Sequence, residues 1–259
     1  MRMMKKVLGT VTVLALSVSL LAGCGSTAAS PVSSAASTAA ESTTSSVVSE
    51  TTSAAADENE AAAAQLLNDL TGSYQELWPV ILADEYKQTW LDDCTALVGE
   101  DNAEAAFEKL SSMVTGDVYG EDAVKAYANG GGAYFCGFTN SLATLTFDGE
   151  TSTISGTDKD GNVLFSHTYH YIGMEPVHEL YEFESDDADS GEFTYFFLAP
   201  DTSAETYHIE FRYGSDAEAL SQYDAGEYAY WVASGISTDC DQTMIDNCIE
   251  LFCTENLAG

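Results

Sequence analysis

Basic residues are scarce in this chain: 8 Lys and Arg stand against 42 Asp and Glu in 259 residues, which gives a formal net charge of −34. Nucleic-acid binding needs clustered Lys and Arg to neutralise phosphates, so this charge balance argues against a nucleic-acid partner. Adsorption to anionic lipid is disfavoured for the same reason. A strongly acidic protein instead attracts cations from solution.

Common catalytic signatures are absent as well. The sequence contains neither a G-x-S-x-G nucleophile elbow nor an H-E-x-x-H helix motif, and we find no convincing pair of nucleophile and base. No C-x-x-C occurs among the six cysteines, which disfavours a thiolate zinc knuckle or a thioredoxin-type redox site. We therefore predict that the protein is not an enzyme.

The N-terminus has the pattern of an export signal. Arg2, Lys5 and Lys6 form a positive region before an apolar run from 7 to 21, which is short for a transmembrane helix. The following Leu-Ala-Gly-Cys resembles the lipobox of bacterial lipoproteins. This resemblance implies a signal peptide over 1–23, lipidation of Cys24 and anchoring outside the cytoplasm. The alternative is an ordinary signal peptide with an incidental cysteine.

Residues 24–56 are almost entirely Ser, Thr and Ala, with too little bulky apolar content for a core. We expect a disordered tether there and one folded domain over 57–259, a length typical of a single domain. Five cysteines remain after Cys24, an odd number: Cys94, Cys136, Cys240, Cys248 and Cys253. Outside the cytoplasm, a disulfide between Cys94 and a C-terminal cysteine is allowed, but the sequence leaves the pairing open.

Helical patterns come first in the domain and strand patterns follow. Apolar spacing predicts helices over 59–70, around Leu77 and Trp78 after a Ser73 cap, and over 84–98, 104–114, 121–128 and 239–253. Alternating β-branched and aromatic residues predict strands over 133–138, 142–147, 151–156, 163–172, 177–183, 193–199 and 206–213. Successive antiparallel strands favour a meander closed into a barrel or sandwich, and the fold class is α+β.

The last predicted hairpin carries the candidate site. Along its second strand, His208, Glu210 and Arg212 point to one face, since strand side chains alternate. An imidazole and a carboxylate two residues apart can bind one metal ion. The same spacing also suits a solvent face on which Glu210 pairs with Arg212. Two further histidines, His167 and His170, lie on opposite faces of the 163–172 strand, where His167 is also compatible with a role in the core.

Four segments together resemble the ZinT/YodA family of extracytoplasmic zinc-binding proteins. They are Leu70–Pro79, Asp148-Gly149, Leu180–Glu184 and Phe193–Gly214. The resemblance implies a lipocalin-like (calycin) antiparallel β-barrel with N-terminal helices and a C-terminal helix. It also implies a divalent metal, zinc above all, that is captured for delivery to an uptake transporter.

Three histidines hold zinc in that family. Carried onto this chain, the first falls on His208, the second on Glu210, which is still a competent ligand, and the third on Phe196, which is not. His167 or His170 completes the site if its strand lies against the hairpin. The alternative is a metal-free barrel that serves as a surface interaction module or binds a small apolar ligand in a lumen. That lumen would be lined by Tyr169, Tyr171, Phe197 and Phe211.

Overall fold

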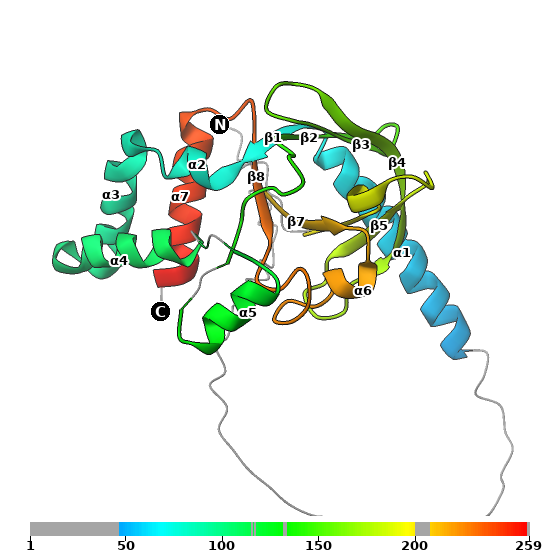
Figure 1. The fold of residues 1–259 in the computed structure, drawn as a ribbon, viewed down its shortest axis with the longest axis horizontal. Helices are drawn as coiled ribbons and strands as arrows, with labels where there is room; N and C mark the ends of the chain where they lie inside the picture. The colour runs from blue at the N-terminus through cyan, green and yellow to red at the C-terminus, as the bar shows by residue number, and fades with distance from the viewer. Residues whose placement is uncertain (1–46, 115, 117, 132–133, 200–207, 258–259) are drawn as a thin grey trace, which may run out of the picture.

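The computed structural model describes residues 47–114, 116, 118–131, 134–199 and 208–257, with side chains from residue 58 onward. Among them the strands form one closed antiparallel barrel in the order β1 to β8, with β8 pairing back to β1 (Figure 1). The strands are β1 (Gly72–Glu76), β2 (Thr144–Asp148), β3 (Thr153–Thr157), β4 (Val163–Met174), β5 (Tyr181–Ser185), β6 (Tyr195–Leu198), β7 (His208–Gly214) and β8 (Ala233–Ser237). The predicted α+β class and the barrel are confirmed.

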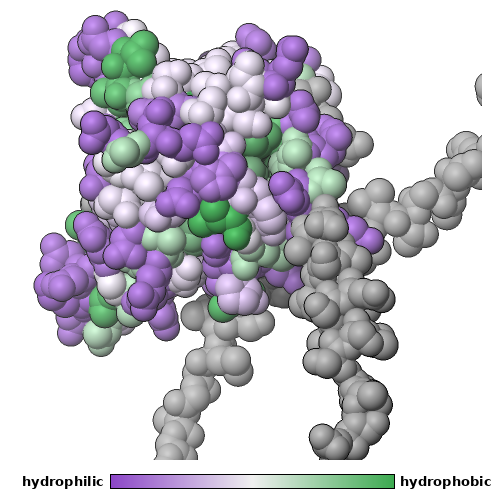
Figure 2. Space-filling view, turned by 90° about the vertical axis from the view of Figure 1, so that its right-hand side faces the viewer, coloured by the Kyte–Doolittle hydropathy of each residue, from purple (hydrophilic) through white to green (hydrophobic). Residues whose placement is uncertain are grey.

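Helices cover the outside of the barrel. They are α1 (Val47–Asp69), α2 (Leu77–Ile81), α3 (Lys87–Val98), α4 (Glu100–Met113), α5 (Glu121–Ala128), α6 (Ala217–Leu220) and α7 (Gln242–Leu257). Helices α2, α3, α4 and α7 gather on one side of the barrel, and α1 lies along another (Figure 1). None of the helices in the described ranges has the length and apolar character needed to cross a membrane. The face in Figure 2 is mostly hydrophilic with small separate hydrophobic patches, as the acidic composition predicts.

Two hydrophobic cores share the barrel wall formed by β7 and β8. The first fills the barrel and contains the inward side chains of β7, Ile209 and Phe211 among them. The second lies between the helical layer and the outer face of β8, where Ile236 packs with Trp90 of α3 and Ile249 of α7. Because neighbouring residues of a strand face opposite ways, one wall of the barrel contributes to both cores.

Several expected boundaries differ from the structure. The segment after residue 72, predicted as a capped helix, forms β1 before the short α2, and β8 was not predicted at all. The strand expected over 133–138 is reduced to a single bridge between Phe135 and Trp231 among its described residues. Helix α1 begins at Val47, within the stretch expected to be tether. The expected signal peptide, Cys24 and residues 25–46 lie outside the described residues, so the division into domains stays a prediction.

Candidate functional site

Strand β7 presents its polar side chains to the outside of the barrel, as the alternation predicts. Ile209, Phe211 and Tyr213 belong to the interior core, so His208, Glu210 and Arg212 face outward. His208 is only 6% exposed and lies under α7, with its ring 5.9 Å from that of Phe252. This face is therefore covered by other elements and is not a plain solvent face.

The two β4 histidines do not join this face. In the barrel β5 and β6 separate β4 from β7, so the strand of His167 and His170 does not lie against β7. His167 Nδ1 lies 2.7 Å from the Asp187 carboxylate, and its ring neighbours Phe165 on the inward face. His170 Nδ1 lies 2.8 Å from the Asp186 carboxylate. The expected grouping of either histidine with His208 and Glu210 is therefore not formed.

Phe196, at the third family ligand position, points into the barrel. It is fully buried, and its ring lies 5.4 Å from those of Tyr169 and Tyr213 and 5.9 Å from that of Phe165. Tyr169 donates its hydroxyl to the Phe193 carbonyl oxygen, 2.5 Å away. These rings pack against one another across the interior, which does not favour an apolar ligand in the lumen.

The expected lining of that lumen is also only partly met. Tyr169, Tyr171 and Phe211 belong to or pack against the interior core. Phe197 belongs to that core as well, but it is paired in register with Arg212 and thus lies on the outward face of β6.

Glu210 lines a cavity together with a histidine to which the sequence pattern assigned no role. Glu210 and His178 both line a cavity of about 40 Å³, together with Leu180, Ala199, Phe211, Tyr223 and Val232. His178 lies in the turn between β4 and β5, and its ring contacts the Tyr223 ring at a tilt of 40°, with 3.7 Å between centroids. A cavity of this size has room for a water molecule or an ion.

A buried carboxylate fixes the orientation of His178. Glu175 is 1% exposed, and it accepts the backbone N–H groups of Val177 at 2.9 Å and His178 at 2.6 Å. The same carboxylate lies 3.3 Å from Nδ1 of the His178 ring. In neutral imidazole, a hydrogen on Nδ1 that is donated to Glu175 leaves the Nε2 lone pair available to a ligand.

Arg212 lies next to this cavity, against the ring of Tyr223. Its guanidinium is fully buried and donates to the carbonyl oxygens of Leu220, of Gln222 at 3.2 Å and of Tyr228 at 2.5 Å, and it lies 4.2 Å from the centre of the Tyr223 ring. Burial lowers the pKa of Arg212, while the nearby Tyr223 opposes that change. Burial also raises the pKa of Tyr223, so its hydroxyl stays protonated beside the cavity.

Across the described residues, no group of three or more His, Cys, Asp and Glu side chains is placed to hold a metal ion together. The residues carried over from the ZinT/YodA resemblance therefore do not form a complete zinc site. His178 and Glu210 supply two ligands of the right chemistry at one cavity.

No protein-family profile matches this chain, and no curated protein sequence matches it. Among solved structures the chain is similar to the Zn(II)-bound ZinT-like domain of AdcA from Streptococcus pneumoniae. The identity is 15% and the TM-score 0.45, over 71% of this chain and 89% of that one. It is also similar to Zn(II)-bound AdcA from Streptococcus pneumoniae, with 14% identity and a TM-score of 0.42, over 72% of this chain and 35% of that one.

The chain thus spans about a third of that second protein. Similarity at this level assigns no ligand and no residue role to the present chain. Membership in the ZinT/YodA family stays a prediction.

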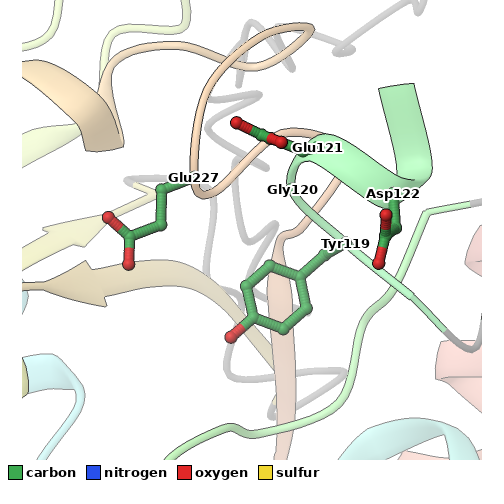
Figure 3. Close-up of a pocket in the computed structure, with 5 residues that line it drawn as sticks. All are labelled: Tyr119, Gly120, Glu121, Asp122 and Glu227. Carbon is green, nitrogen blue, oxygen red and sulfur yellow. The ribbon is translucent and has the colours of Figure 1, made fainter. Parts of the chain in front are cut away.

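A larger and more open pocket, of about 410 Å³, lies beside the start of α5 (Figure 3). Glu121, Asp122 and Glu227 line it together with Tyr119 and Gly120. Figure 3 shows Asp122 and Glu227 on opposite sides of the Tyr119 ring. Asp122 accepts a hydrogen bond from Lys125 at 3.0 Å, so part of this negative charge is already compensated. The pocket is acidic, but its carboxylates do not converge on one point.

Proposed function

We propose that this protein is a lipid-anchored extracytoplasmic protein that binds a divalent metal ion, preferably Zn²⁺, at the small cavity lined by His178 and by Glu210 of β7. In this proposal the protein ligands are Nε2 of His178 and the carboxylate of Glu210. The observation that carries it is that both side chains line the same small cavity. Imidazole nitrogen and carboxylate oxygen are both common zinc ligands.

The surroundings of His178 support a role as a ligand. Metal-bound histidines usually donate their second ring N–H to a carboxylate or a carbonyl, which fixes the tautomer and raises the basicity of the ligating nitrogen. Glu175 is in place for this role, and its own orientation is set by two backbone N–H groups. The Glu175 carboxylate therefore faces one ring nitrogen of His178, and the other ring nitrogen is left for a metal ion in the cavity.

Two protein ligands imply weak and exchangeable binding. Zinc is normally four-coordinate, so water or a ligand from a partner would fill the remaining positions. The binding free energy should then fall below the roughly 10–16 kcal/mol of structural zinc sites. Weak binding of this kind suits a protein that captures a metal ion and passes it to an uptake transporter, which is the role we propose.

The proposed location depends on the sequence alone. It is supported by the lipobox-like Leu21-Ala22-Gly23-Cys24 and by the Ser/Thr/Ala-rich stretch after it. The excess of acidic residues fits this location, because it favours the accumulation of cations near the protein.

Zinc titration calorimetry on the chain from Cys24 to Gly259 tests the proposal. We expect one-to-one binding that weakens at least about tenfold in His178→Asn and in Glu210→Gln, since each removes one of two ligands. His167→Asn and His170→Asn are matched controls, because both histidines bond to Asp side chains away from the cavity. Binding that is unchanged in His178→Asn and Glu210→Gln, or that is lost equally in the controls, contradicts the assignment.

A further inference from the structure

We propose that Cys94 and Cys253 form a disulfide bond that joins α3 to α7 once the protein is outside the cytoplasm. This inference rests on the proposed location and is independent of the proposed metal site. The two sulfur atoms lie 3.9 Å apart although 159 positions separate the residues in the chain. Both side chains are fully buried in the core between the helical layer and the barrel.

Formation of the disulfide requires little movement of the two sulfur atoms. A disulfide has a sulfur–sulfur distance of about 2.0 Å, so the two atoms must approach by about 1.9 Å. Helices α3 and α7 already pack against each other, so a change of side-chain rotamers and a small shift of the helices can close this gap. The cysteines therefore lie in elements that the fold itself brings together.

The reaction needs an oxidant, which we assign to the class of disulfides, either a protein disulfide oxidase or a low-molecular-weight disulfide of an oxidising compartment. One cysteine thiolate attacks one sulfur of the oxidant's disulfide, so that its S–S bond breaks, the other sulfur leaves as a thiolate and a mixed disulfide forms. The second thiolate attacks that bond and releases the reduced oxidant. Overall, two S–H bonds break and one S–S bond forms, and the oxidant takes up two electrons and two protons as two thiols.

The burial of Cys94 and Cys253 indicates at which stage of folding the disulfide forms. Burial raises the pKa of the Cys94 thiol, although the contact with Cys253 partly opposes the change, and burial also raises the pKa of Cys253. Since the thiolate is the reactive form, both groups react slowly in the folded protein. Oxidation should therefore take place before α3 and α7 close over the pair. The completed bond is then shielded from reductants.

The bond would also fix the helix that covers His208. Cys253 follows Phe252, whose ring packs beside His208 on the outer face of β7. A covalent link from α3 to this end of α7 holds the C-terminal helix against the barrel. In this proposal, Cys136, Cys240 and Cys248 remain thiols.

The test compares two preparations of the full chain. Protein isolated from the cell envelope is denatured, alkylated without reductant and digested. We expect a linked Cys94–Cys253 peptide that disappears on reduction, with Cys136, Cys240 and Cys248 alkylated. Reduced protein is also refolded with oxidised glutathione and should form the same link. Cys94→Ala and Cys253→Ala should each abolish the link in both preparations.

Each other outcome overturns the proposal at a defined step. All five thiols alkylated in both preparations would reject the geometry. A link after refolding that is missing from envelope protein would reject oxidation at the proposed location. A different pairing in either preparation would reject the assignment of the partners. Zinc titration of Cys94→Ala reports on the metal site separately, because neither cysteine lines its cavity.

Discussion

Replacement of Arg212 by methionine should destabilise the whole domain. The fully buried guanidinium donates to three backbone carbonyl groups, at Leu220, Gln222 and Tyr228, and so ties the segment between β7 and β8 to the barrel wall. Methionine retains most of the side-chain volume but donates no hydrogen bond. The variant therefore isolates the contribution of the guanidinium from that of packing.

The size of the effect follows from the hydrogen bonds that are lost. A hydrogen bond to a charged group contributes about 1.5–3 kcal/mol, so three such bonds set an upper bound of about 9 kcal/mol. Two effects reduce that figure. Methionine avoids the cost of desolvating a cation, and in the variant the carbonyl groups of the segment between β7 and β8 can accept hydrogen bonds from water instead. We expect a net loss of about 3–5 kcal/mol in the free energy of unfolding, typical of removing one partner from a buried charged network.

Urea denaturation followed by tryptophan fluorescence measures this change. Trp231 is a suitable probe because it is 1% exposed and its ring lies 5.9 Å from that of Tyr228, in the segment that Arg212 holds. Arg212→Lys should fall between the wild type and the methionine variant, since an ammonium cannot reach all three carbonyl groups. The exposed Lys159→Met is the matched control and should change stability by less than about 0.5 kcal/mol. A loss below about 1 kcal/mol in Arg212→Met would refute the reasoning.

Two further substitutions test the interior and one turn. Phe196→Ala should cost about 3–5 kcal/mol of unfolding free energy, because it opens a cavity among the stacked rings, and Phe196→His should leave zinc affinity unchanged in calorimetry. Little loss of stability in Phe196→Ala would contradict this packing, and a gain in zinc affinity in Phe196→His would show that position 196 faces a metal site. Gly149→Ala should cost about 1–3 kcal/mol, since the added Cβ would meet the Asn68 Cα at 2.4 Å and push the β2–β3 turn away from α1. The exposed Glu150→Ala is its control, and equal melting temperatures for the two variants would contradict this close approach.

Most of the barrel was predictable from the sequence because its central strands carry long alternating patterns. The segments that became β4 and β7 have β-branched or aromatic residues at every second position. Strands β1 and β8 lack this signal. β1 has one buried aromatic residue, Tyr74, and β8 contains small residues around Ile236. Both are strands because each pairs with a neighbour on either side, and this tertiary effect is not visible in local sequence.

The candidate site was predictable only in part. Alternation correctly predicted that His208, Glu210 and Arg212 share a face, but it could not show that α7 covers His208 or that Arg212 binds loop carbonyl groups. His178 was given no role because it lies at the start of the strand predicted over 177–183, where alternation pairs it with no other candidate ligand. A usable signal was present in Glu175-Pro-Val-His178, where a carboxylate three residues before a histidine caps the turn and reaches the ring. Spacing alone does not show that such a carboxylate is buried.

The pairing of the first strand with the last has a consequence for behaviour at high concentration. Open sheets present rows of unpaired N–H and C=O groups that can join sheets of neighbouring molecules edge to edge. Here the register Tyr74↔Ser237, Gln75↔Ile236 and Glu76↔Gly235 joins β1 to β8 and removes both free edges. This seam is short and is made by the two strands with the weakest local preference. Opening of the barrel should therefore begin there, and exchange of β1 between neighbouring copies is the form of self-association against which this closure protects.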